Sequence, residues 1–192
     1  MHIAAYLVIA LAFGISNMLL FRRCAELTPI RLTQGLWLSF FVGLTQATLF
    51  LGGMAIGNLL RFELPDNPDA FTNANALIFF GFTIFVMLRM LLPYLRREPK
   101  LPLFDLTNDK VRVALALTAA VNPLLVGLGV GFVASSAQFS LILPLVMWVL
   151  MWFFGYWGIM LGRRKVTLRP RRWMIVSCVL LLGVAIAAIV NA

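Results

Sequence analysis

Three side-chain amides, Asn17, Gln46 and Asn122, lie inside long stretches of sequence that carry no charge. An amide buried in hydrocarbon without a hydrogen-bond partner costs about 1–3 kcal/mol, so each of these residues needs a partner or a ligand. Their oxygens are of the kind that hard cations accept. Hydroxyls in the same stretches that could assist are Ser16, Thr45 and Thr118. The pattern predicts a neutral polar site for an ion or small solute; interhelical hydrogen bonds between the amides are the alternative.

Asn122 is followed by Pro123, which has no backbone N–H and removes the helical hydrogen bond to the carbonyl of Ala119. Proline also biases the preceding residue away from helical angles. The sequence therefore predicts a break in this segment, with a freed carbonyl beside the Asn122 amide.

The chain that must position these residues has 192 residues, of which 62% are hydrophobic and 12% are charged, and a mean hydropathy of +0.96. Soluble proteins are about half apolar and one quarter charged, so a soluble globular domain is excluded. At about 20 residues per crossing, the length allows six transmembrane helices with short connections. We predict an all-α integral membrane protein.

Uncharged runs locate the six spans. The run at 113–162 is too long for one helix, and the small polar residues 134–138 form a turn that divides it into two. A polar loop is expected at 62–75. The other spans are predicted at 3–21, 32–60, 76–95 and from 173 to the C-terminus.

Charge alternates between the connections. The net charge is +2 over 22–31, −2 over 61–69, +2 over 96–112 and +6 over 163–172. Because cytoplasmic loops carry an excess of Lys and Arg, both termini are expected outside the cytoplasm in a multi-pass protein of the cell membrane. The loop at 163–172 could also bind anionic lipid head groups.

The same distribution argues against other functions. The formal charge of +9 lies mostly in these loops, which explains it without nucleic acid as a partner. His2 is the only histidine, and Cys24 and Cys178 form no paired motif, so no cofactor and no imidazole or thiolate metal site is expected. No nucleophile, base and orienting group can be assembled, which disfavours an enzyme.

Two patterns recur at an offset of 105 residues. Residues 17–20 (Asn-Met-Leu-Leu) match 122–125 (Asn-Pro-Leu-Leu), and the pair Gly53 and Gly57 matches Gly158 and Gly162. Halves of three spans each must run in opposite directions, as in the inverted repeats of secondary transporters. We therefore predict a single domain over 1–192, with repeats at about 1–97 and 110–192, and helix packing at the four glycines.

Two further expectations concern side chains at the lipid boundary. Arg89 could extend toward the membrane surface or face a polar interior. Bulky side chains of the second, third and fifth spans are expected to face lipid: Phe40, Phe41, Met87, Trp148, Met151 and Trp152.

The sequence resembles the MntP-type manganese efflux pumps of the LysE transporter superfamily. The similarity lies at 12–16 in the first span, 43–46 and 53–57 in the second, 88–90 in the third and 122–131 in the fourth. The resemblance implies six spans, exterior termini, duplicated halves and transport of manganese or another divalent cation. It also implies membrane carboxylates that handle the cation: an Asp in each of the first and fourth spans, and a Glu in the second.

At those positions this chain carries amides. Asn122 falls on the fourth-span Asp, Gln46 on the second-span Glu, and Asn17 on the first-span Asp when one residue is deleted. We expect a small secondary transporter with a neutral, amide-lined site near the membrane midplane, in which Asn17, Gln46 and Asn122 are the metal ligands. The alternatives are a transporter of a non-metal solute and a membrane scaffold that transports nothing.

Overall fold

The fold is a bundle of six helices, seen in a computed structural model that describes residues 3–28, 30–61, 68–95, 108–134 and 142–190. No strand occurs in these segments. The helices are α1 (Ile3–Leu27), α2 (Leu32–Leu59), α3 (Pro68–Leu95), α4 (Asp109–Val133), α5 (Ile142–Arg163) and α6 (Pro170–Val190).

All six helices are long and apolar enough to cross a membrane, which confirms the predicted six spans. The boundaries differ most at α3, because the polar loop expected at 62–75 gives way to helix from Pro68 onward. Proline is favoured in the first turn of a helix, where its missing N–H costs no hydrogen bond. The turn expected at 134–138 is described only at Ala134, which caps α4; the rest lies outside the described residues.

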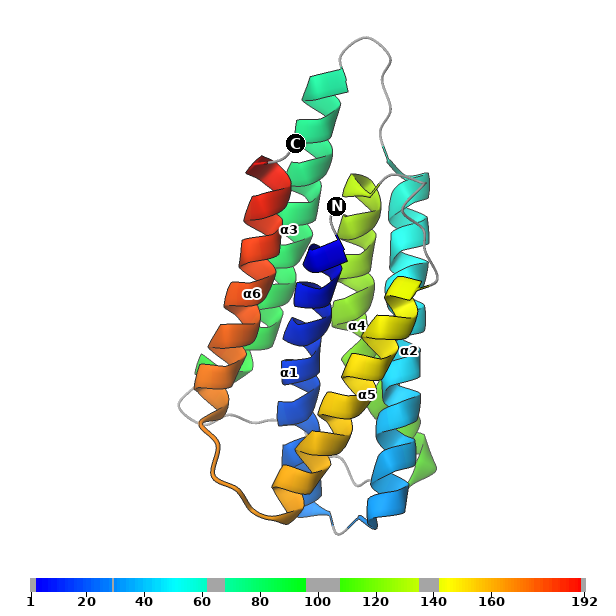
Figure 1. Cartoon of the computed structure of the whole chain (residues 1–192), viewed down its shortest axis with the longest axis vertical. Coiled ribbons are helices and arrows are strands. Elements are labelled where there is room, and N and C mark those ends of the chain that lie inside the picture. The colour runs from blue at the N-terminus through cyan, green and yellow to red at the C-terminus, as the bar shows by residue number, and fades with distance from the viewer. Residues whose placement is uncertain (1–2, 29, 62–67, 96–107, 135–141, 191–192) are drawn as a thin grey trace.

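Successive helices run in opposite directions along the bundle, and both chain ends lie at the same end of it (Figure 1). The connections that follow α1 and α5 lie at the opposite end (Figure 1). α1 and α4 consequently run in opposite directions, as do α2 and α5, and α3 and α6.

The helix pairs that pack most closely are α2 with α4, α1 with α5, α2 with α5, α3 with α6, α3 with α4, and α1 with α6. This set is unchanged when α1, α2 and α3 are exchanged for α4, α5 and α6. The packing is consistent with the inverted repeat predicted from the sequence. The division of the domain at about 97–110 stays a prediction.

Glycines set the two closest helix crossings. A Cβ atom on Gly53 or Gly57 of α2 would overlap the carbonyl oxygen of Leu124 or Leu128 on α4. At the related crossing, a Cβ on Gly158 or Gly162 of α5 would overlap the carbonyl of Met18 or Arg22 on α1. All four glycines therefore touch the backbone of a neighbouring helix: Gly53, Gly57, Gly158 and Gly162. Such contacts require residues without side chains, which explains the motif in both halves.

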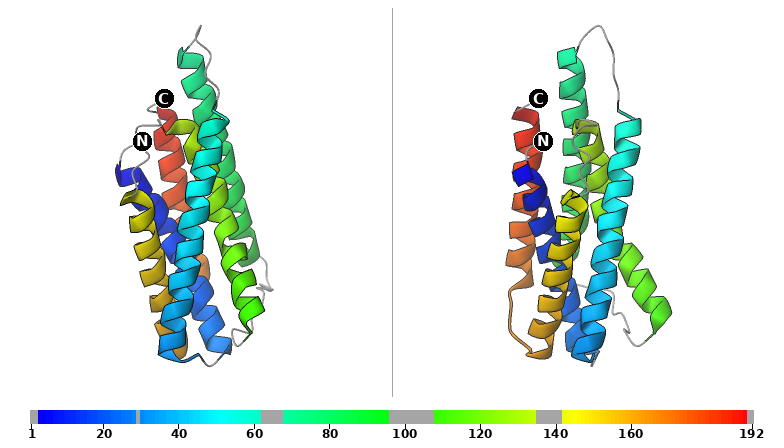
Figure 2. Two further views of the ribbon diagram at one scale, coloured as in Figure 1. Left: turned by 90° about the vertical axis from the view of Figure 1, so that its right-hand side faces the viewer. Right: turned by 45° about the vertical axis from the view of Figure 1, so that its right-hand side comes forward.

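Pro123 lies inside α4, which continues past it as a helix from Asp109 to Val133. The predicted break is therefore wrong, although the first half of α4 leans away from the bundle in Figure 2. A proline inside a helix removes one backbone hydrogen bond and commonly bends the axis.

The exposure of Arg89 and Met151 tests two predictions about side chains at the lipid boundary. Arg89 is exposed on the outer surface of α3, which favours extension toward the membrane surface over a polar interior. Met151 is fully buried, so the expectation that it faces lipid is wrong. Met151 belongs to the main hydrophobic core, where an unbranched thioether can fill irregular gaps.

Candidate functional site

Asn17 and Gln46 form a reciprocal pair near the middle of the bundle. The Asn17 Nδ2 donates to Gln46 Oε1 at 2.5 Å, and the Gln46 Nε2 donates to Asn17 Oδ1 at 2.8 Å. Both side chains are almost fully buried, with exposed fractions of 3% and 2%. Each amide thereby satisfies one donor and one acceptor of the other, which removes most of the cost of burying them.

The positions of the pair follow from the helices that carry it. Asn17 lies about two thirds of the way along α1, and Gln46 lies in the middle of α2. α1 and α2 are not among the closely packed helix pairs, because α1 packs on α5 and α6 while α2 packs on α4 and α5. The two amides therefore link helices that otherwise make few contacts. The apolar neighbours Met18, Ala47 and Phe50 belong to the surrounding core.

Asn122 does not join this pair. Its side chain is half-buried, and its Oδ1 atom is buried with no hydrogen-bond partner among the described residues. The hydrogen-bonded set is therefore Asn17 and Gln46 alone, and the convergence of all three amides on one pocket stays a prediction. A buried acceptor without a partner is rare in native proteins and calls for a functional or structural reason.

A difference of one residue in helix register explains why Asn122 does not form the hydrogen bonds that Asn17 forms. The glycines of α2 contact the carbonyls of Leu124 and Leu128, whereas those of α5 contact the carbonyls of Met18 and Arg22. Asn122 precedes Leu124 by two residues, so its counterpart on α1 is Ser16, and the counterpart of Asn17 is Pro123. One residue turns a helix by about 100°, and Asn122 therefore leaves α4 in a different direction from Asn17 on α1.

The candidate hydroxyls occupy three different environments. Ser16 is half-buried next to Asn17 on the chain. The Thr45 hydroxyl donates to the Phe41 carbonyl at 2.8 Å, on its own helix. Thr118 is exposed on α4, and it is therefore not brought to the buried amides. Ser16 and Thr45 are therefore each next to one member of the pair on the chain, and the Thr45 hydroxyl already donates to its own helix.

Other polar contacts between helices were not identified from the sequence. The Ser177 hydroxyl of α6 donates to the Ala12 carbonyl of α1 at 2.7 Å, and the Trp148 Nε1 of α5 donates to the Phe40 carbonyl at 3.3 Å. Ser177 is fully buried, and an uncharged polar residue inside an apolar run is the signal that could have identified it. These bonds join the two halves.

The chemistry of the site is neutral. Among the described residues, no group of three or more His, Cys, Asp or Glu side chains could hold a metal ion. Ions at the bundle centre would meet amide and backbone oxygens in a region whose other atoms are apolar. Amide oxygens coordinate hard cations but do not offset their charge.

Comparison with known proteins identifies the family. The chain has no significant match among curated proteins or among solved structures. A family model described as "Putative manganese efflux pump" (MntP) matches residues 29–189. This range includes Gln46, Asn122 and the glycine pairs of α2 and α5, and it begins after α1, which carries Asn17. The match covers most of the chain, and the protein belongs to the MntP family.

Proposed function

We propose that this protein is a small secondary transporter that exports manganese or another divalent cation, with Asn17, Gln46 and Asn122 supplying oxygens to the ion. The buried reciprocal pair of Asn17 and Gln46 is the observation that carries the proposal. It places two amides at the centre of a six-span bundle whose family is that of manganese efflux pumps. Polar residues kept inside a membrane bundle commonly mark ion pathways.

Binding would change the hydrogen bonding of the pair. Each amide oxygen now accepts an N–H from the other amide. A cation would take over both oxygens, and the two N–H groups would need new acceptors. The Oδ1 of Asn122, near the middle of α4, has no hydrogen-bond partner among the described residues and would supply a third oxygen. Affinity would be weaker than at a carboxylate site, because no ligand offsets the ion's charge.

The transmembrane orientation follows from charge. The connections after α1 and α5 lie at one end of the bundle, while the termini lie at the other end. Together with the helix ends beside them, these connections (22–31 and 163–172) carry eight of the thirteen arginines. We place the basic end in the cytoplasm. A cysteine introduced at Asp69 should react with an impermeant reagent in intact cells, and one at Arg169 only after permeabilisation. The reverse pattern would refute this orientation.

Transport by the full chain in proteoliposomes tests the function. We expect manganese flux with the natural protein, none with Asn122→Ala, and strongly reduced flux with Gln46→Leu. Asn58→Ala is the matched control, since Asn58 lies at the far end of α2 and its amide should be dispensable. Equal flux in all four proteins would exclude the amide site.

A scaffold that transports nothing is the second candidate. The observation that favours it is that Asn17 and Gln46 already satisfy each other, as amides that merely hold helices together would. No manganese flux with the natural protein, combined with normal folding and membrane insertion, would support this function over transport.

A further inference from the structure

A groove of about 650 Å³ separates the N-terminal halves of α2 and α4. The two helices touch through backbone at Gly53, Gly57 and Gly127, and diverge toward their N-termini. The lean of α4 ahead of Pro123 is visible in Figure 2. The groove therefore opens sideways between two membrane-spanning helices, in the part of the membrane next to the basic end of the bundle.

Large apolar side chains form the body of the groove. Trp37 and Phe41 of α2 are 58% and 56% exposed, and Val113 and Leu117 of α4 are 60% and 53% exposed. The lining extends along α2 from Thr33 to Thr45, which is about 18 Å at 1.5 Å per residue. This is more than half of the ~30 Å thickness of the hydrocarbon core. The body of the groove matches an extended hydrocarbon chain.

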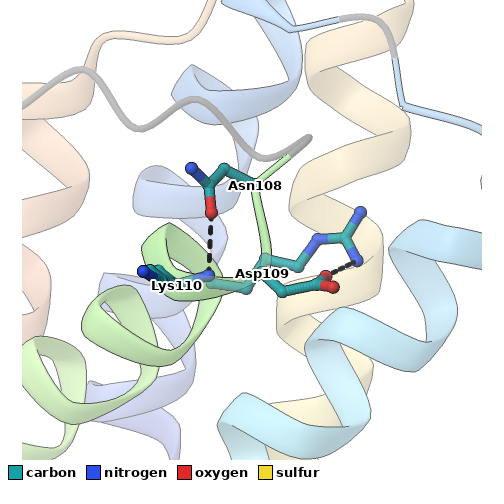
Figure 3. Close-up of polar contacts among 4 residues, drawn as sticks. Asn108, Asp109 and Lys110 are labelled. Atoms are coloured by element: carbon teal, nitrogen blue, oxygen red, sulfur yellow. Dashed lines mark hydrogen bonds and ion pairs between the residues drawn. The ribbon is translucent and has the colours of Figure 1, made fainter.

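The mouth of the groove is polar, and its lining holds one basic and one acidic side chain. It is formed by the first turns of α2 and α4, with Thr33, Gln34, Asp109 and Arg112 in the lining. Arg112 contacts the exposed carboxylate of Asp109 at 2.6 Å, and Asn108 accepts a hydrogen bond from the Lys110 backbone N–H at 3.0 Å (Figure 3).

Charges near the mouth do not cancel. Among the described residues, Arg31 precedes α2 and Lys110 lies beside the groove lining in the first turn of α4. With Arg112, these make three basic side chains for the one described carboxylate at this place, that of Asp109. The N-termini of two parallel helices add partial positive charge at the same place. An anion with an attached hydrocarbon chain would complement both parts of the groove.

We infer that the groove binds an anionic phospholipid, with one acyl chain along Trp37, Phe41 and Leu117 and the phosphate near Arg112. The bilayer supplies such a molecule directly at the sideways opening. A zwitterionic phospholipid would fill the body of the groove equally well but would gain little from the positive mouth. None of the three amides, Asn17, Gln46 and Asn122, lines the groove, so the inference stands whether or not the protein transports a cation.

Native mass spectrometry of the full chain, with phosphatidylglycerol or phosphatidylcholine added, tests the head-group end. Since a Lys or Arg near anionic lipid contributes about 1 kcal/mol, we expect Arg112→Gln to weaken phosphatidylglycerol binding about fivefold and to leave phosphatidylcholine unchanged. Asp109→Asn should strengthen it, because the opposing carboxylate is gone. Arg171→Gln, an exposed arginine at the start of α6, is the matched control.

The acyl-chain end is tested by filling the groove. Val113→Trp should reduce binding of both lipids, whereas Val179→Trp, at an equally exposed position on α6, should not. In the natural protein, phosphatidylglycerol with brominated chains should quench Trp37. The share of tryptophan fluorescence that the brominated lipid quenches should decrease in Trp37→Phe. It should stay the same in Trp157→Phe, which removes another exposed tryptophan.

Several results would overturn the inference. Equal losses for Arg112→Gln and Arg171→Gln would mean general attraction to a basic surface. Weaker phosphatidylglycerol binding by Asp109→Asn would mean that binding depends on the structure of the α4 N-terminus that Asp109 supports, and not on the net charge there. Unchanged lipid binding in Val113→Trp would place the lipid outside the groove.

Discussion

Asn17 and Asn122 are the same residue type on related helices of the two halves, but their surroundings differ. Asn17 is buried and doubly bonded to Gln46, whereas the Oδ1 of Asn122 is buried with no partner among the described residues. The sequence offset of 105 suggests equivalent positions. The helix crossings show that Asn122 corresponds to Ser16 instead.

The partner residue differs as well. The glycine offset that relates Gly53 to Gly158 places Met151 at the position of Gln46. Met151 is fully buried and offers no strong donor to an asparagine. The comparison teaches that the two halves share a helix framework, while the polar pair at its centre belongs to the first half alone.

The largest effect is expected from a substitution at the crossing of α2 and α4, one of the two crossings that relate the halves of the molecule. Gly53→Ala places a Cβ against the Leu124 carbonyl and the Leu128 backbone N, so α2 and α4 must separate. We expect a loss of about 1–3 kcal/mol in the free energy of unfolding, measured in bicelles.

Gly52→Ala is the control, because a Cβ at Gly52 meets nothing within 4 Å. It should be neutral or stabilising by up to about 1 kcal/mol, since alanine favours helix over glycine. Equal effects at the two neighbouring positions would show that the crossing does not depend on Gly53.

The next effect separates the paired amide from the unpaired one. Gln46→Leu leaves the buried Asn17 amide without its partner and should cost about 1–2 kcal/mol of unfolding free energy. A double-mutant cycle with Asn17→Leu should give a coupling between about 0.6 and 1.7 kcal/mol, the average and the maximum measured for hydrogen bonds between membrane helices. A coupling of zero would mean that the pair does not stabilise the bundle.

The smallest effect is expected at Asn122. Asn122→Leu removes an acceptor that has no partner, so the unfolding free energy should change by less than about 0.5 kcal/mol or rise. The same unfolding assay applies, and any loss of unfolding free energy should be smaller than that of Asn17→Leu. A loss as large as that of Asn17→Leu would show that Asn122 does have a stabilising partner.

Hydropathy and loop charge predicted the six spans because crossing a bilayer requires long uncharged helices. They could not locate the start of α3 at Pro68, since a helix can continue beyond the hydrocarbon into a polar sequence. The amides themselves were predictable, as uncharged polar residues are costly in the membrane. Their pairing was not, because a shift of one residue in register turns a side chain by about 100°.

The glycine motifs were identifiable from spacing, but which helices they join was not. Gly53 and Gly57 contact α4, and Gly158 and Gly162 contact α1, so each half packs across to the other. Thr118 shows that closeness in sequence does not predict a shared site either. It lies on the same helix as Asn122 and is nevertheless exposed, since four residues of sequence distance do not establish a shared site.

Titration of the purified full chain with Mn²⁺, followed by electron paramagnetic resonance of the free ion, tests the central claim that the amides form the cation site. Asn122→Asp adds one negative charge and no volume, and should tighten binding about tenfold or more, because ligand charge tunes cation affinity. Asn58→Asp, which adds the same charge near the end of α2, should leave the affinity unchanged. Equal affinity in the natural protein, Asn122→Asp and Asn58→Asp would contradict the account.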